Sequence, residues 1–167
     1  MTQIIAGTVL DLQKTPAQYI KELLETNWSI SIPAKDNGTN GGVQFYNSWT
    51  NEAGSKWQLC VLQRVEVPTT ESMGRQRSDI DSSVDVHIWG RNIVVRQENQ
   101  TIIPELLNMR NEFYRIIREH WQDITIFWDC RVSSMRRIED EPLTQYSEKS
   151  NWHYVASINV KYSIITT

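Results

Sequence analysis

The sequence predicts an α+β fold, in which an antiparallel or mixed sheet of about five strands carries two helices packed on one face. Two segments show the apolar spacing of amphipathic helices, and the other periodic segments alternate as half-buried strands do. The elements follow the order α-β-β-β-α-β-β along the chain. Helices that alternate with runs of strands favour one layer of helices against one sheet.

The first helix is expected to begin at Pro16, because proline suits the first helical position. Thr15 can cap this helix, and Gln18 follows three residues later, as in a capping box. Apolar residues on one face continue as far as Trp28. The helix is expected to end there, since the next residues alternate and stop at Pro33.

The second helix is expected from Thr101 onward, where apolar residues form one stripe. Pro104 is compatible with this helix only near its start, because proline in a helix interior removes a hydrogen bond. The preceding segment, residues 91–100, either begins this helix or precedes it. The stripe comprises Ile102, Ile103, Leu106, Leu107, Phe113, Ile116, Ile117 and Trp121.

The first two predicted strands form a β-hairpin. Residues 43–48 are a short strand, a turn follows over residues 51–55, and residues 57–67 are the second strand. Alternation along the second strand separates a core side from a solvent side. The predicted core side carries Trp57, Leu59, Val61, Val65 and Val67, and the solvent side carries Gln58, Arg64 and Glu66.

The third strand is predicted over residues 79–89, and the last two strands over residues 124–135 and 152–164. Polar stretches between them predict two long loops, at residues 68–78 and 136–150. The pattern of the third strand directs Asp79, Asp81, Asp85 and His87 outward.

A single domain over residues 1–167 is expected, with a short lead segment at residues 1–14. The formal net charge of −3 argues against a protein that binds nucleic acid through a basic face. No apolar run has the length of a membrane span, and the N-terminus lacks the pattern of a secretion signal. We therefore expect a soluble intracellular protein whose Cys60 and Cys130 are buried free thiols.

No constellation in the sequence points to catalytic residues, a cofactor site or a metal site. The three histidines have no metal-ligand spacing, neither cysteine has a nearby histidine, and no phosphate-binding loop is present. Asp79, Asp81 and Asp85 share one face of a strand, and this spacing could hold a divalent cation. A small metal-dependent nuclease is therefore kept as an alternative to a solvated or subunit-facing strand surface.

Candidate contact residues come from strand ends and from charged loops. Trp49 and Trp89 stand at the ends of strand-like runs, where a large rigid ring suits a protein contact. Charged clusters in the two predicted loops could steer association with a partner. The candidate interface residues are Trp49, Arg75, Arg77, Asp81, Asp85, His87, Trp89, Arg136, Arg137, Glu139, Asp140 and Glu141.

The order of these elements and the residue patterns within them resemble those of the tail terminator (tail completion) proteins of long-tailed phages and related viruses. The resemblance covers about residues 15–165 and rests on a helix before a hairpin, a strand with Val-Asp-Val alternation and a helix rich in Leu and Ile. The lead segment and the long 136–150 loop lie outside this pattern. The residues that carry it are Ser83–Trp89, Leu106–Ile117, and Trp152, Tyr154, Ile158, Val160 and Tyr162.

This resemblance implies a virion structural protein of the tail or neck, assembled in the host cytoplasm, and not an enzyme. Such proteins form a hexameric ring that ends polymerisation of the tail tube and offers a docking surface to the head or neck connector. The implied partners are further copies of the chain, the tail tube protein and the connector. No membrane and no sequence-specific nucleic acid are implied, although a ring leaves room for the genome to pass. The alternatives are another head–tail assembly component, such as a head-completion protein or a tube subunit, and the nuclease.

Overall fold

The computed structural model describes residues 14–38, 41–49, 57–71, 77–90, 95–97, 100–102, 104–140 and 151–165. These residues form one five-stranded sheet, a separate two-stranded hairpin, two α-helices and a 3-10 turn. The elements are α1 (Pro16–Asn27), β1 (Gln44–Tyr46), β2 (Gln58–Glu71), β3 (Arg77–Trp89), β4 (Val95–Gln97), β5 (Gln100–Ile102), α2 (Pro104–His120), η1 (Trp121–Asp123), β6 (Asp129–Asp140) and β7 (Asn151–Ile165).

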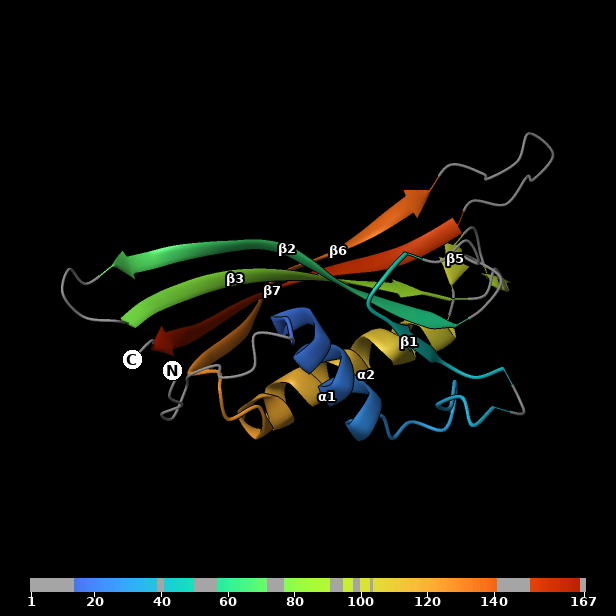
Figure 1. Ribbon diagram of the computed structural model, residues 1–167. Helices are drawn as coiled ribbons and strands as arrows, with labels where there is room; N and C mark the ends of the chain where they lie inside the picture. The colour runs from blue at the N-terminus through green and yellow to red at the C-terminus, as the bar shows by residue number, and fades with distance from the viewer. Residues whose placement is uncertain are drawn as a thin grey trace.

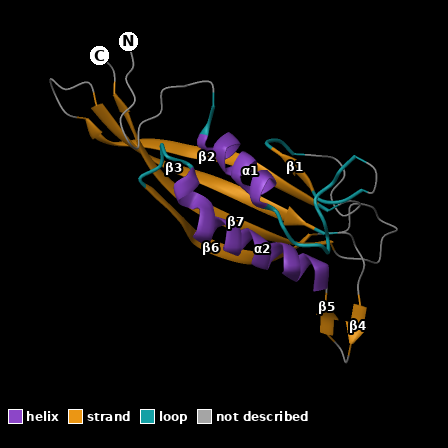
Figure 2. Cartoon of the chain, turned by 90° about the horizontal axis from the view of Figure 1, so that it is seen from below, coloured by secondary structure: helices purple, strands orange, loops and turns teal. Residues whose placement is uncertain are grey.

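The strands of the main sheet follow the order β1-β2-β3-β7-β6, and both helices pack on one face of it (Figure 1). Figure 2 views the molecule from the helix side, where the small β4–β5 hairpin lies next to the N-terminal end of α2. The predicted α+β class, the mixed sheet and the one-sided helix layer are confirmed. The predicted order of elements also holds, with β4 and β5 added before α2.

The first helix forms as its local sequence predicts. The Thr15 hydroxyl accepts a hydrogen bond from the backbone N–H of Gln18, and the Gln18 side chain accepts one from the Thr15 N–H, at 3.3 and 2.7 Å. These two bonds satisfy N–H groups that a helix start leaves without helical partners. One face of α1 then buries Ile20, Leu23 and Leu24 against the sheet.

The second helix begins at Pro104, so the predicted place of this proline near the helix start is confirmed. The predicted apolar stripe began one turn too early, because Ile102 belongs to β5. It also ran too far, since Trp121 opens the 3-10 turn. Within α2 the buried stripe is real: Leu106, Met109, Phe113, Ile116 and Ile117 all pack into the core.

Glu112 ties α2 to the segment that follows α1. Its side chain is only 3 % exposed and accepts hydrogen bonds from the backbone N–H and the hydroxyl of Ser29, at 2.9 and 3.0 Å. Arg115 completes the cluster with a 2.6 Å ion pair to the same carboxylate. Burial alone would raise the pKa of Glu112, but the bonds from Arg115 and Ser29 hold this pKa below its usual value.

The predicted β-hairpin between the first two strands is wrong, because β1 pairs with β2 in parallel. Gln44 lies opposite Gln58, and its backbone N–H donates to the Trp57 carbonyl at 3.0 Å. Alternation of side chains predicts strands but does not give their direction. The parallel partner covers only the first residues of β2, from Gln58 to Cys60.

A bulge at Arg64 reverses the sides predicted for the second half of β2. Gln63 pairs with Val84 and Val65 with Ser83, so Arg64 is an extra residue in the ladder. One extra residue moves every later side chain to the opposite face. Val65 and Val67, predicted in the core, are therefore 53 % and 48 % exposed on the face away from the helices.

The same bulge turns Glu66, predicted to face solvent, toward the helix side. There its carboxylate accepts a 2.7 Å hydrogen bond from the hydroxyl of Tyr162, a residue of the core cluster. Burial raises the pKa of that hydroxyl, and Glu66 raises it further. Glu66 thus fastens the outer part of β2 to the sheet, a role that strict alternation does not predict.

The two long loops predicted at residues 68–78 and 136–150 are wrong over part of their length. In the first, β2 continues to Glu71 and β3 starts at Arg77. In the second, β6 continues to Asp140. Polar residues extend these strands because cross-strand backbone bonds are available to any side chain. The remaining loop residues, 72–76 and 141–150, lie outside the described residues, as do residues 1–13 of the lead segment.

The strand predicted from residue 124 starts later, at Asp129. Ile124 and Phe127 belong to a turn, closed by a 3.1 Å bond from the Phe127 N–H to the Ile124 carbonyl. Both side chains are buried, which explains why their apolar pattern resembled a strand. No helix within the described ranges is long and apolar enough to cross a bilayer.

Candidate functional site

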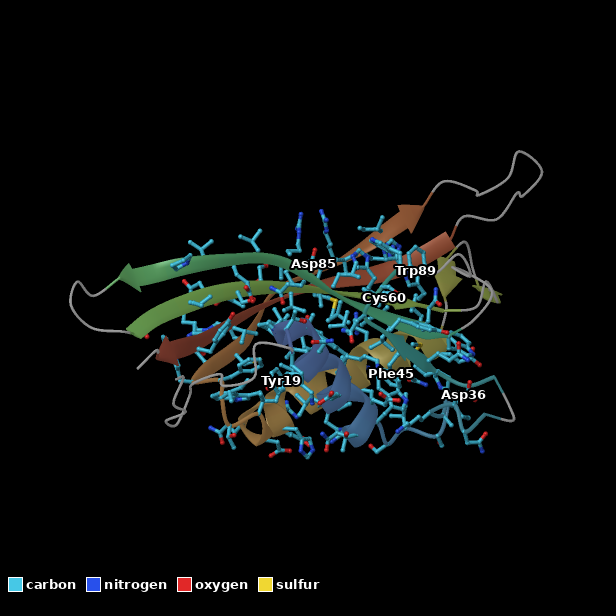
Figure 3. The ribbon with its side chains drawn as sticks, viewed as in Figure 1. Tyr19, Asp36, Phe45, Cys60, Asp85 and Trp89 are labelled. Carbon is cyan, nitrogen blue, oxygen red and sulfur yellow. The ribbon has the colours of Figure 1, made fainter. Side chains whose placement is uncertain are left out.

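The face of the sheet opposite the helices, here called the helix-free face, carries most of the candidate contact residues on the strands. Figure 3 shows Asp85 and Trp89 on the strands and Tyr19 on the helix side below. Cross-strand pairing brings residues from four strands into rows. From one end to the other these rows are Gln58/Trp89/His153/Ile138, Cys60/His87/Val155/Arg136, Leu62/Asp85/Ser157/Ser134, Val65/Ser83/Asn159/Arg131 and Val67/Asp81/Lys161/Asp129.

Four aromatic rings follow one another in contact across this face, and we call Trp49, His87, His153 and Trp89 the four-ring stack, although the Trp49 and His87 rings are tilted at 58° to each other. The centroid distances are 4.4 Å from Trp49 to His87, 5.5 Å from His87 to His153, and 3.8 Å from His153 to Trp89. Trp49 is 60 % exposed, whereas Trp89 is only 7 % exposed. Of the two tryptophans predicted as contact residues, Trp49 is therefore accessible and Trp89 is covered within the chain.

The two histidines of the stack are coupled. Their facing nitrogens, Nδ1 of His87 and Nε2 of His153, lie 3.4 Å apart. The pKa of His87 is lowered from 6.5 to about 4, mainly by burial and next by the neighbouring His153, whereas Asp85 acts in the opposite direction. Arg136 and Arg64 also disfavour the charged imidazole. His87 is therefore neutral at physiological pH.

The three aspartates considered as a cation site each bind a different neighbour, and Asp79 accepts a hydrogen bond from the Ser163 hydroxyl. Asp85 accepts a 2.7 Å bond from the Ser157 hydroxyl and pairs with Arg64 at 3.2 Å. Asp81 lies 3.8 Å from the ammonium of Lys161. Within the described ranges no three His, Cys, Asp or Glu side chains gather as metal ligands would. The nuclease alternative gains no support from this arrangement.

The remaining candidates are distributed over two strands and their tips. Arg136 and Arg137 are exposed on β6. The backbone of Arg77 lies within β3, and the backbones of Glu139 and Asp140 lie within β6. Arg75 and Glu141 lie outside the described residues. The structure thus places the candidates of β3 on one face, while those of β6 lie along one edge of the sheet.

A hollow of about 630 Å³ lies on the helix side, between the segment after α1 and α2. Its charged lining residues are Glu112 and Arg115, which bind each other and Ser29. A catalytic carboxylate needs contact with a substrate proton or a reacting atom. Here the carboxylate already holds two elements of the fold together, so the hollow shows no group set aside for chemistry.

Two open edges of the sheet are the feature that the sequence did not predict. In the part of the chain that the structure describes, β6 is the last strand on one side. On the other side, β1 covers β2 only up to Cys60, so β2 has no strand neighbour there from Val61 to Glu71 within the described ranges. Strand order depends on pairings between distant segments, and no local sequence signal gives it.

The comparisons with known proteins leave the fold and this surface as the basis for function. No family model matches the chain, and a search of curated proteins finds no match to it. A function is therefore inferred from the open edges, from the helix-free face and from the resemblance in element order.

Proposed function

We propose that the chain is the subunit of a closed ring in a viral tail or neck, which ends the tail tube and offers a docking surface to the head or neck connector. The observation that carries this proposal is the pair of open edges, on β6 and on β2. An edge strand presents unpaired N–H and C=O groups, which favour pairing with another chain. Two such edges on one sheet allow each subunit to bind a neighbour on both sides.

The strand directions fit this mode of assembly. β2, β3, β7 and β6 run antiparallel to their neighbours in that order, so β2 and β6 run in opposite directions. When copies are related by rotation about an axis along the strands, β6 of one copy meets β2 of the next in an antiparallel pair. The alternation then continues from subunit to subunit without interruption.

The charges favour contact between unlike edges over contact between like edges. The exposed charged side chains in the middle of β6 are Arg131, Arg136 and Arg137. Pairing β6 with a second β6 would place arginines against arginines, and like charges across strands are destabilising. Along β2 beyond the bulge, the exposed acidic side chain within the described residues is Glu66. Heterologous contacts of this kind close into rings when the rotation between copies allows it.

A closed sheet of this kind would direct the helix-free face and the helix layer to opposite sides of the ring wall. Docking of a connector and passage of the genome then use different surfaces. The hexameric count comes from the resemblance to tail terminator proteins, and the edge geometry is compatible with any closed number of copies.

The mass of the purified protein in solution tests the ring directly. Six copies of a 19.5 kDa chain give 6 × 19.5, or about 117 kDa. We expect a particle of this mass by native mass spectrometry, either alone or after addition of tail tubes. A protein that stays monomeric under both conditions contradicts the proposal. Spontaneous growth into long tubes would instead identify a tube subunit.

A further inference from the structure

We propose that the four-ring stack is an acid-sensitive clasp, which holds Trp49 on the helix-free face and releases it when the stacked histidines take up protons. This inference is independent of the ring proposed above, because all of its groups belong to one chain. It assigns to His87 and His153 a regulatory role in place of a catalytic one.

The segment after β1 is held at two points, and only one of them depends on the histidines. The Asn47 side-chain amide donates to the carbonyls of Ala17 and Val61, at 3.1 Å each. These bonds fix Asn47 to α1 and β2 and involve no titratable group. Two residues later, Trp49 touches the sheet through its ring contact with His87. Release of that contact frees Trp49 while Asn47 stays in place.

The histidine pair can remain close only while at least one of its two rings is neutral. At 3.4 Å, one imidazole N–H donates to the bare nitrogen of the other, which requires that at least one facing nitrogen carries no proton. When both rings are protonated, each facing nitrogen carries a hydrogen and a share of positive charge. The hydrogen bond is then lost, and the two rings repel each other.

The surroundings of His87 do not compensate that charge. From β2 it faces Cys60 and Arg64, from β7 Val155 and His153, and from β6 Arg136. The carboxylate among these neighbours, Asp85 of β3, already pairs with Arg64 and accepts from Ser157. Among the described residues, the charged groups around a protonated His87 would therefore be mostly cationic.

Cation–π attraction between a charged histidine and Trp49 acts in the opposite direction, so the two effects need comparison. The pKa of His87 falls from 6.5 to about 4, which corresponds to a preference of roughly 300-fold for the neutral ring. A cation–π contact at an exposed site contributes only a few-fold. When Trp49 moves away, water reaches His87 and its pKa returns toward 6.5. Proton binding therefore stabilises the released form.

Fluorine NMR of the whole chain labelled with 5-fluorotryptophan would test the clasp. The Trp49 signal is assigned by its loss in Trp49→Phe, and the protein is then titrated from pH 7 to pH 3.5. We expect the Trp49 signal to move toward the position of free fluorotryptophan below pH 6. The core tryptophans Trp28 and Trp57 serve as internal reporters of the fold, and their signals should stay unchanged over the same range.

The variant His87→Phe keeps a ring in the stack and removes its proton-binding site, so the Trp49 signal should no longer titrate. His120→Asn is the matched control, because this histidine lies at the end of α2 and pairs with Asp123. It should leave the Trp49 titration unchanged. A Trp49 signal that stays constant, or that moves only together with Trp28 and Trp57, overturns the clasp. The wild-type titration alone decides this if the His87 variant does not fold.

Discussion

Proline at one of two neighbouring positions on β6 should convert the proposed ring into a folded monomer. In an antiparallel strand, successive residues direct their backbone N–H groups to opposite sides. Of Arg136 and Arg137, one therefore bonds to β7 and the other points outward to the open edge. Proline is tolerated on an edge strand where the lost N–H faces outward. The outward-facing variant should fold normally and fall from about 117 kDa to 19.5 kDa.

Proline at the other of these two positions and two alanine variants serve as controls. They show whether loss of the ring comes from the missing edge N–H, from a weakened chain or from the missing charge. Proline at the inward-facing position removes a bond to β7 and should weaken the chain itself, as seen in its thermal unfolding. Arg136→Ala and Arg137→Ala remove each charge but keep each N–H, so they should retain at least part of the ring. If the outward-facing proline variant is folded and still forms a particle of full mass, β6 is not a subunit contact.

Loss of the Glu112 carboxylate should produce the second large effect, on stability. Glu112→Ala leaves the Ser29 N–H and hydroxyl without their acceptor and removes a nearly buried partner from Arg115. Hydrogen bonds to charged groups contribute about 1.5–3 kcal/mol each, and Arg115 can regain water at its exposed side. We expect the free energy of unfolding to fall by about 3 kcal/mol in urea titrations.

Glu119→Ala is the matched control, since Glu119 also binds Arg115 but lies on the surface. An exposed pair of this kind contributes little to stability, so the free energy of unfolding should stay close to that of the wild type. The pKa of Glu112 is lowered in the folded chain, so its stabilisation is present above the pKa of the unfolded state. It is lost as the pH falls through the folded pKa. A wild-type protein whose stability excess over Glu112→Ala does not shrink in acid would contradict this account.

The helices could be predicted from the sequence because their signals are local. Thr15 and Gln18 lie three residues apart, and both bonds of the predicted capping box are present. Pro104 likewise marks the start of α2 from a single position. Bonds between residues close in sequence leave a pattern that sequence analysis can read.

The sheet was predicted less well, because its decisive features are non-local. The bulge at Arg64 depends on how β2 meets β3, and no residue type at that position requires it. Valine is apolar whichever face of the strand it occupies, so the residue type does not reveal the bulge. Alternation alone therefore assigns Val65 and Val67 to the core. The parallel direction of β1 depends on where the chain re-enters the sheet, which local alternation does not record.

The candidate surface shows the same division. Outward alternation placed Asp85 and His87 on one face, and the structure has them there. The partner of His87, His153, lies 66 residues away in sequence, and no local pattern links the two histidines. Charge and residue type predicted which side chains could make contacts, whereas strand order decided which of them share a row or an edge.

Growth of tail tubes in the presence of the purified chain tests the central claim most directly. Purified tube protein is allowed to polymerise with and without the chain, and tube lengths are measured by electron microscopy. If the chain is a ring that ends the tube, tubes should stay short in its presence and carry a ring of density at one end. The outward-facing proline variant of β6 should not shorten them. Tubes that grow to the same length with and without the wild-type chain, and that carry no ring, would contradict the account.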